Sequence, residues 1–371
     1  MRIAIVGAGF SGLSTAWHLL NKESCEVFIF DAKGIGGGAS GMAAGLMHPY
    51  VGEEGRRSHL ATEGMAASRE LIDRVEEKSG KKVANREGIL RYMLSEEQTQ
   101  RYFRHCTEYG DVEPDGEGCF WIKSGMTVDC PAYLEGLWEL LSERGATLVQ
   151  EEVSCLSFLK DYDEVIVAAG AGMLKFPELS HLIPNATENL DLRPSQSPGI
   201  ERSNLAPISN NGDDSIAPIA GAFASVLNQI FSRVGYKCYT VKGQVLLCTV
   251  PDSIQLPPVT RILKGYIAPS GIPGHCTIGS TYERGLSDDL PDPHFARADL
   301  FPKVAPLFAK ADQLKIADCK AGLRVVRKGH YFPIIAQVRS GLWVIGAMGS
   351  RGLLYHAFAG KLLAEAILYG G

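Results

Sequence analysis

The chain has 371 residues, a length that accommodates two lobes or one large α/β domain. Its formal net charge of −5 gives no indication of a nucleic-acid partner, and no apolar run reaches the roughly 18 residues that a membrane-spanning helix needs. The nine cysteines are odd in number and never spaced as Cys-x-x-Cys. This pattern argues against a zinc site, so no metal is expected, and it favours reduced thiols in a cytoplasmic protein.

Strands and helices alternate along the first part of the chain. Residues 2–6 and 26–30 are apolar and predict two strands, with a helix over about 11–22 between them. Residues 58–79 repeat apolar side chains at helical spacing. Residues 131–144 predict another helix, because a proline stands in the first turn and a glycine follows the last.

The later part of the chain contains short strands and one irregular segment. Further strands are predicted at 146–150, 164–170 and 239–250. Residues 188–215 are rich in proline, serine and asparagine and predict an irregular surface insertion.

A glycine-rich turn, GAGFSG at residues 7–12, joins the first strand to the first helix. Gly7 permits a tight turn, Gly9 lets the backbone approach a pyrophosphate, and Gly12 allows close helix–strand packing. The amide groups at the helix start would face the phosphates. Asp31 ends the next strand and is placed to accept hydrogen bonds from a ribose, which disfavours NADP and leaves NAD and FAD open.

A second small-residue loop, AKGIGGGASGMAAGLMHPY at 32–50, stands where a dehydrogenase would have an ordinary helix. Small residues at this density let the backbone run beside a flat ring. Here the chain resembles the D-amino-acid oxidase and glycine oxidase family of flavoenzymes, and the resemblance implies FAD as the cofactor. It also implies an α/β (α+β), two-lobed fold, in which a Rossmann-type FAD-binding domain is interleaved with a substrate domain on a mixed, largely antiparallel sheet.

The resemblance implies domains made of separated segments. The FAD-binding domain is expected to comprise residues 1–80, 131–187 and 324–371. The substrate domain is expected to comprise residues 81–130 and 188–323, with the irregular insertion inside 188–238.

The same resemblance implies FAD contacts along the N-terminal half. At the glycine turn and the acid they are Gly7, Gly9, Phe10, Ser11, Gly12, Asp31 and Ala32. Along the small-residue loop they are Ala39, Ser40, Ala44, Gly45 and Leu46. Near the adenine and a second glycine turn they are Val153, Ala169 and Gly170. His48, beside the small-residue loop, is expected to have a packing role.

The C-terminal segment WVIGAMGSRGLLYH repeats the pattern of strand, glycine turn and helix, with the helix expected to start within 349–352. Reduced flavin gathers negative charge around N1 and the C2 carbonyl, which a helix start stabilises through amides and dipole. The two glycine turns are therefore expected to hold opposite ends of one FAD. The implied contacts here are Met348, Gly349, Ser350, Arg351, Gly352, Leu353 and Leu354.

The resemblance also implies two residues for the substrate. Arg324, in the Gly-Leu-Arg of 320–337, falls at the position that anchors a substrate carboxylate through a bidentate pair. Tyr266, in the expected strand pair of 264–285, assists it. The implied reaction is oxidation of the C–N bond of an amino acid or N-substituted glycine-like amine by hydride transfer to flavin N5. O2 or another acceptor then takes the electrons, and alignment carries the catalysis.

Two other functions stay open at this stage. GSRGL at 349–353 and HCTIGSTYERG at 275–285 look most like one branch of the family, the flavin domain of the bifunctional enzyme that makes 5-methylaminomethyl-2-thiouridine in tRNA. That branch implies oxidative removal of the carboxymethyl group from 5-carboxymethylaminomethyl-uridine, although the net charge does not favour tRNA. The other alternative is a non-catalytic flavin-binding protein acting as a redox sensor or assembly partner.

Overall fold

The computed structural model describes residues 1–21, 25–116, 118–183, 235–329 and 331–369. The insertion predicted at 188–215 therefore lies outside the described residues. No helix in the described ranges is long and apolar enough to cross a membrane.

A six-stranded sheet forms one part of the molecule, in the order β17-β18-β10-β1-β2-β9. All neighbouring strands are parallel except β17, which runs antiparallel to β18. Its strands are β1 (Arg2–Val6), β2 (Glu26–Phe30), β9 (Thr147–Val149), β10 (Glu164–Val167), β17 (Ile334–Arg339) and β18 (Leu342–Gly346). The apolar runs of the central strands are buried, as parallel strands covered on both faces require.

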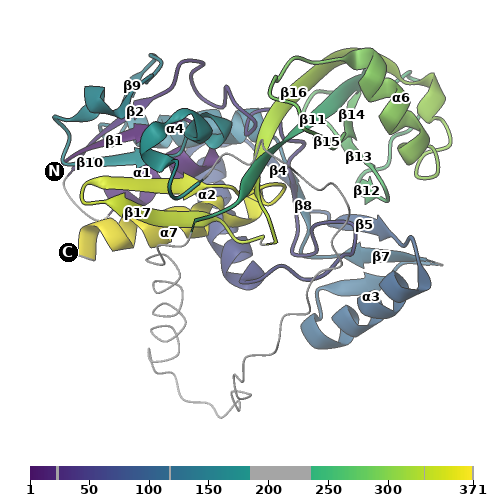
Figure 1. Ribbon diagram of the computed structural model, residues 1–371. Coiled ribbons are helices and arrows are strands. Elements are labelled where there is room, and N and C mark those ends of the chain that lie inside the picture. Colours follow the sequence, from purple (N-terminus) through teal and green to yellow (C-terminus); the bar gives the residue numbers. More distant parts are fainter. Residues whose placement is uncertain (22–24, 117, 184–234, 330, 370–371) are drawn as a thin grey trace, which may run out of the picture.

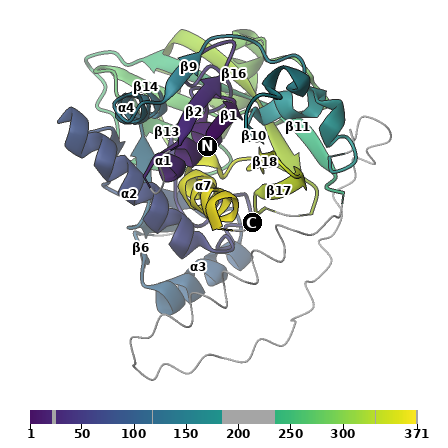
Figure 2. The same cartoon turned by 90° about the vertical axis from the view of Figure 1, so that its left-hand side faces the viewer.

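Helices from both ends of the chain pack against this sheet and one another. They are α1 (Phe10–Leu20), α2 (Ala61–Ser79), α4 (Cys130–Ser142) and α7 (Gly352–Tyr369). Figure 2 shows α7 beside α1 and α2, close to the N-terminus. The helix predicted from residue 58 begins at Ala61, because Leu60 has a left-handed backbone, φ 51°. Asp129 caps α4 by accepting a hydrogen bond from the Ala132 amide.

A nine-stranded sheet forms the second part, on the right in Figure 1. Its order is β15-β11-β14-β13-β12-β5-β7-β6, with β16 paired to β11, and only β12 and β5 are parallel. The strands are β5 (Ile89–Tyr92), β6 (Val112–Pro114), β7 (Cys119–Ile122), β11 (Cys238–Thr249), β12 (Thr260–Ile262), β13 (Tyr266–Pro269), β14 (His275–Gly279), β15 (Glu283–Arg284) and β16 (Lys315–Arg327). The expected strand pair at 264–285 is confirmed as β13 and β14.

Smaller elements complete the fold. Two helices belong to the second part, α3 (Glu96–Tyr109) and α6 (Pro293–Val304), and α6 buries its apolar face on β11 and β14. A three-stranded sheet consists of β3 (Leu46–Met47), β8 (Met126–Val128) and β4 (Ala84–Asn85). The 3₁₀ turns are η1 (Leu156–Leu159), η2 (Gly170–Lys175), η3 (Pro177–Leu179) and η4 (Ala311–Gln313).

The predicted fold class is confirmed: a largely parallel sheet covered by helices is combined with a mixed, largely antiparallel sheet. Each sheet gathers segments that are far apart in the chain. The expected domain boundaries stay a prediction, and β16 runs across the one expected between residues 323 and 324.

Candidate active site

The first glycine turn lies at the carboxyl end of β1. Gly7 has φ +117°, and a Cβ there would lie 2.5 Å from the Ala168 carbonyl oxygen. A Cβ on Gly12 would overlap the Gly7 carbonyl oxygen. Both positions require glycine, and the strand–turn–helix geometry that the sequence predicts is present.

Helix α1 begins at this turn without a side-chain cap and without an acidic residue in its first turn. The Phe10 amide donates to Ser40 Oγ, 3.1 Å away, so the small-residue loop lies against the helix start. A Cβ on Gly9 would lie 2.8 Å from the same oxygen. The positive end of the helix dipole therefore lies beside small residues, at the place where a phosphate is expected.

Asp31 lies directly beside the turn. Its carboxylate accepts hydrogen bonds from the amides of Ala8 and Lys33, both at 2.9 Å. An ionised carboxylate accepts about four hydrogen bonds, so lone pairs remain for ribose hydroxyl groups. Ala32 follows Asp31 as the chain leaves β2.

The residues expected near the adenine converge at one place. Val153 and Ala169 pack against the same apolar cluster, together with Phe30 at the end of β2. Gly170 has φ +54° and opens the turn η2. These side chains gather at the carboxyl ends of parallel strands, where open α/β sheets bind ligands.

The small-residue loop continues from α1 toward the second sheet. A Cβ on Gly322 of β16 would lie 3.1 Å from the Ala39 Cα, so the loop and β16 touch closely. Gly45 has φ +78°, and a Cβ there would overlap the Val128 carbonyl oxygen. Ala44 is half-buried, and Leu46 pairs with Thr127 of β8.

Helix α7 begins at Gly352, within the expected range of 349–352. Gly349 itself belongs to the turn, because it adopts φ +54° and its amide donates to the Val325 carbonyl oxygen. The two glycine turns are also in contact: Ser11 Oγ donates to Met348 Sδ at 3.7 Å. They adjoin and are not separated by the length of a cofactor.

The residues after this turn divide between the pocket and the core. Ser350 and Arg351 line a pocket, whereas the side chains of Leu353 and Leu354 belong to the apolar core under the first sheet. Only the backbone of Leu353 and Leu354 is therefore open to a ligand at the helix start.

Arg324 projects from β16 across Gly243 of β11, as a Cβ on that glycine would lie 2.7 Å from the arginine Nη2. The same Nη2 donates to the Thr281 carbonyl oxygen at 3.2 Å. Burial lowers the pKa of Arg324, and the phenols of Tyr266 and Tyr282 oppose this shift. Among the described residues, no carboxylate forms an ion pair with Arg324, so its charge is left for a ligand.

Tyr266 lies near Arg324 but outside the pocket. Its hydroxyl hydrogen-bonds with Ser280, and burial raises its pKa well above the ordinary value. Tyr282 instead borders the pocket, with the Arg324 Cζ 5.6 Å from its ring centroid.

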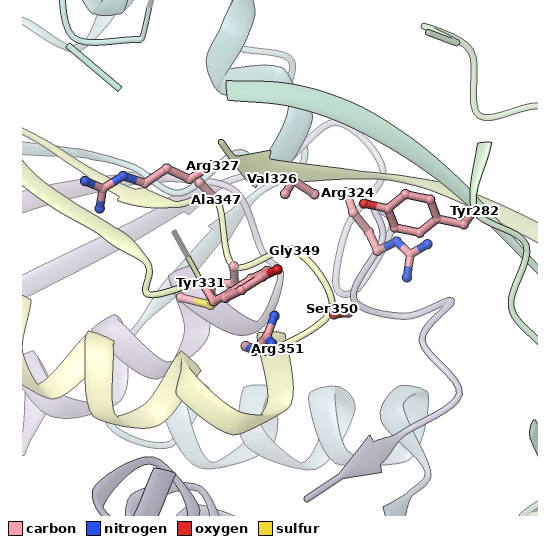
Figure 3. Close-up of a pocket in the computed structure, with 10 residues that line it drawn as sticks. Tyr282, Arg324, Val326, Arg327, Tyr331, Ala347, Gly349, Ser350 and Arg351 are labelled. Carbon is pink, nitrogen blue, oxygen red and sulfur yellow. The ribbon is translucent and has the colours of Figure 1, made fainter. Parts of the chain in front are cut away.

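The pocket lies between β16 and the C-terminal turn (Figure 3). Arg324 and Tyr282 lie on one side of it, and Arg351 lies below Tyr331. The sequence analysis missed Tyr282 and Tyr331 as pocket residues. Tyr282 stands in the GSTYERG segment that the resemblance had already picked out, but nothing in that segment indicates which strand it faces.

His48 is buried beside the small-residue loop. Burial and the nearby charges of Arg91 and Arg351 lower its pKa to about 3, so the imidazole is neutral. Its Nδ1 accepts a hydrogen bond from the Tyr50 amide at 3.3 Å.

Curated relatives align along nearly the whole chain. The "tRNA 5-methylaminomethyl-2-thiouridine biosynthesis bifunctional protein MnmC" of Marinobacter nauticus is 22% identical over 384 residues, which cover 98% of this chain and 55% of the relative. The "Uncharacterized oxidoreductase YurR" of Bacillus subtilis is 24% identical over 382 residues, covering 98% of this chain and 94% of the relative. The chain thus spans about half the length of the first relative.

Solved structures share the fold. Glycine oxidase from Geobacillus kaustophilus superposes with a TM-score of 0.70 at 20% identity, covering 98% of this chain and 94% of that one. Iminodiacetate oxidase from Chelativorans sp. BNC1 gives a TM-score of 0.71 at 19% identity, covering 99% and 95%.

The sequence profile described as "DAO: FAD dependent oxidoreductase" matches residues 2–218 and 219–366. The match includes both glycine turns, Asp31 and Arg324. The chain belongs to the DAO family of FAD-dependent oxidoreductases.

Proposed function

We propose that this protein binds FAD and oxidises the C–N bond of an amino acid or N-substituted glycine that carries a carboxylate. The observation that supports the proposal best is Arg324, a half-buried cation beside a pocket and without a carboxylate partner among the described residues. A buried charge is costly unless an opposite charge meets it. A substrate carboxylate would supply that charge.

The residues around the two glycine turns suit FAD. The uncapped start of α1 would hold the pyrophosphate, and Asp31 would accept hydrogen bonds from the ribose. Backbone amides at the start of α7 would face the pyrimidine side of the ring. Gly9, at the start of α1 and beside Ser40, has no side chain that would block the approach of a pyrophosphate, which supports this arrangement.

Bound FAD would supply the acceptor, at N5, for the hydride that leaves the carbon next to the amine nitrogen. The role of the protein is to orient the substrate. Arg324 would hold the carboxylate through two parallel hydrogen bonds, which fixes the direction of the C–H bond. Tyr266, near Arg324, would position the guanidinium rather than touch the substrate. O2 or another acceptor would then take the electrons.

Anaerobic mixing of the FAD-loaded protein with a panel of amino acids and N-alkylglycines tests the proposal. We expect the flavin absorbance near its long-wavelength maximum to bleach with at least one carboxylated amine and not with the matching amine that lacks the carboxylate. A protein that binds FAD but is reduced by none of them would instead be a flavin-binding protein without amine oxidase activity. Failure to bind FAD at all would contradict the whole proposal.

A second candidate is the oxidative removal of the carboxymethyl group from 5-carboxymethylaminomethyl-uridine in tRNA. The similarity to MnmC over 98% of this chain favours it, since that relative is named for tRNA modification. The carboxymethyl group and the nitrogen that carries it form a glycine unit, so Arg324 would again hold the carboxylate. Hypomodified tRNA belongs in the same anaerobic panel, and bleaching by tRNA alone would favour this candidate.

A further inference from the structure

The pocket beside Arg324 is lined by more positive charge than one carboxylate needs. Arg324, Arg327 and Arg351 all border it, and no aspartate or glutamate does so among the described residues. The three arginines are not equivalent, because their guanidinium groups have different neighbours.

Arg351 faces the pocket, and its partners among the described residues are neutral. Its Nε donates to Ser58 Oγ at 3.2 Å, and its Nη2 donates to the Val51 carbonyl oxygen at 2.9 Å. Its Cζ lies 4.1 Å from the centroid of the Tyr331 ring. The residue is 8% exposed, and no carboxylate pairs with it in the described ranges. Its Nη1 donates no hydrogen bond to any of the described residues.

The surroundings of Arg351 reinforce its charge. Arg91, also buried, donates to the carbonyl oxygens of Gly52 and Glu53, which are neutral. Burial and the charges of these two arginines lower the pKa of His48 to about 3, so this imidazole adds no charge of its own. This side of the pocket therefore attracts anions independently of Arg324.

Arg327 provides a contrast. Its Cζ lies 4.3 Å from the centroid of the Tyr236 ring, and Figure 3 shows its guanidinium directed away from those of Arg324 and Arg351. It borders the pocket with its side-chain stem, whereas its charge lies elsewhere.

We propose that the substrate of this pocket carries two carboxylates: the one next to the oxidised C–N bond binds Arg324, and a second one binds Arg351. The inference rests on the proposed amine oxidation and narrows its substrate class to N-(carboxyalkyl)glycines or dicarboxylic amino acids. Arg351 then determines specificity, since a planar guanidinium matches a carboxylate through two hydrogen bonds.

The test compares matched substrates on the FAD-loaded protein. N-(carboxyalkyl)glycines of increasing arm length are each paired with the N-alkylglycine of equal length, so that only the second charge differs. Under anaerobic conditions, we expect kcat/KM for flavin reduction by the best diacid to exceed that of its neutral partner by roughly tenfold or more. This comparison needs no variant.

Two variants then locate the second charge. In Arg351→Gln, which keeps hydrogen-bonding groups for Ser58 and Val51, the ratio of kcat/KM between diacid and neutral partner should fall toward one. Arg327→Gln removes an equal charge whose guanidinium is directed away from the pocket, and it should keep the wild-type ratio. A uniform loss on both substrates in Arg351→Gln would assign the arginine to the flavin or to packing and overturn the inference.

The remaining outcomes separate the two proposals. Equal reduction by the diacid and its neutral partner in the wild-type protein would overturn the second carboxylate site and leave amine oxidation standing. If no carboxylated amine reduces the flavin, both proposals fall.

Discussion

Arg324 is a cation whose charge is not balanced by a carboxylate among the described residues. Its guanidinium donates to the Thr281 carbonyl oxygen, and burial lowers its pKa, against the opposing effect of the nearby phenols of Tyr266 and Tyr282. The Thr281 carbonyl oxygen is a neutral partner and does not neutralise the charge of Arg324. An incoming carboxylate therefore gains more from this arginine than it would from an exposed one.

Replacing Arg324 should damage catalysis more than cofactor binding. We expect Arg324→Ala to lose about 2–5 kcal/mol of transition-state stabilisation, because one partner of a buried charge pair disappears. Stopped-flow reduction should show the loss in kcat as well as in kcat/KM, since the pair also orients the C–H bond. Arg324→Lys should recover only part of it. Arg327→Ala is the control, and wild-type reduction rates in Arg324→Ala would exclude a carboxylate anchor there.

Two buried histidines should make stability depend on pH. From the ordinary value of 6.5, burial and the charges of Arg91 and Arg351 lower the pKa of His48 to about 3. Burial is the largest cause that lowers the pKa of His356 to about 4. The unfolded chain then binds more protons than the native one below pH 6.5, so the free energy of unfolding decreases as the pH falls. We expect a slope of up to about 1.4 kcal/mol per pH unit for each histidine between about pH 6 and 5.

Urea unfolding at several pH values measures this slope. His356 Nδ1 donates to the Leu353 carbonyl oxygen at 3.1 Å, and its Nε2 accepts from the Tyr133 hydroxyl at 2.7 Å. His356→Gln removes the titration of this imidazole. The variant should show a smaller slope than the wild-type protein. An unfolding free energy that stays constant over this range would mean that both imidazoles are charged in the native state.

At the level of elements, the strand pair β11–β16 links the two parts of the molecule. The strands pair from Cys238 opposite Arg327 to Thr249 opposite Lys315, with a shift of register between Leu247 and Cys248. One end of β16 forms a bridge from Val326 to Met348 in the C-terminal turn. The pair thereby carries Arg324 to the pocket, and Gly243 leaves the space in which the guanidinium lies.

Gly243→Ala should therefore act through Arg324. The new Cβ would lie 2.7 Å from Nη2, and no left-handed backbone angle opposes alanine there, so the flexible guanidinium should shift while the strand stays in place. We expect lower kcat/KM with unchanged flavin content and melting temperature. In an Arg324→Ala background the same change should have little further effect, and a double-mutant cycle that shows simple additivity would contradict this coupling.

The turn between β1 and α1 allows a matched pair of glycine variants. In Gly9→Val the side chain would crowd Ser40 and fill the space expected for the pyrophosphate, so we expect FAD affinity to fall about tenfold or more. Gly38→Ala lies in the neighbouring loop, where an added Cβ meets nothing within 4 Å, and should bind FAD normally. Fluorescence titration with FAD measures both, and normal binding by Gly9→Val would move the pyrophosphate elsewhere.

At the level of the whole molecule, features set by local sequence patterns could be predicted, whereas those set by contacts between distant segments could not. The sequence of strand, glycine turn, helix and acid sufficed for the first turn. Gly12 is required by the Gly7 carbonyl oxygen, which is close in the chain, and Gly7 is required by its own backbone angle, φ +117°. The expected start of α7 within 349–352 agrees with its position at Gly352, whereas the positive φ angle of Ala347 in the preceding turn leaves no mark in the sequence. Tyr282 meets Arg324 only through strand pairing between distant segments.

The two ends of the chain meet where α1 crosses α7. A Cβ on Gly360 would lie 2.7 Å from Ser14 Oγ and 2.9 Å from the backbone nitrogen of Thr15, so the helices touch at this glycine. The hydrogen bond from Ser14 Oγ to the His356 carbonyl oxygen, 2.8 Å, lies at the same crossing. Both glycine turns stand at the starts of these two helices, so their relative position depends on this contact.

Gly360→Val should consequently disturb stability and cofactor binding together. Overpacking of a close helix crossing typically costs about 1–3 kcal/mol, and the helices must separate because backbone atoms block the new side chain. We expect a lower melting temperature without FAD and weaker FAD binding, as the two turns move apart. Lys361→Ala, at the exposed neighbouring position, should change neither. If Gly360→Val lowered the melting temperature but bound FAD with wild-type affinity, the crossing would support the fold without setting the cofactor site.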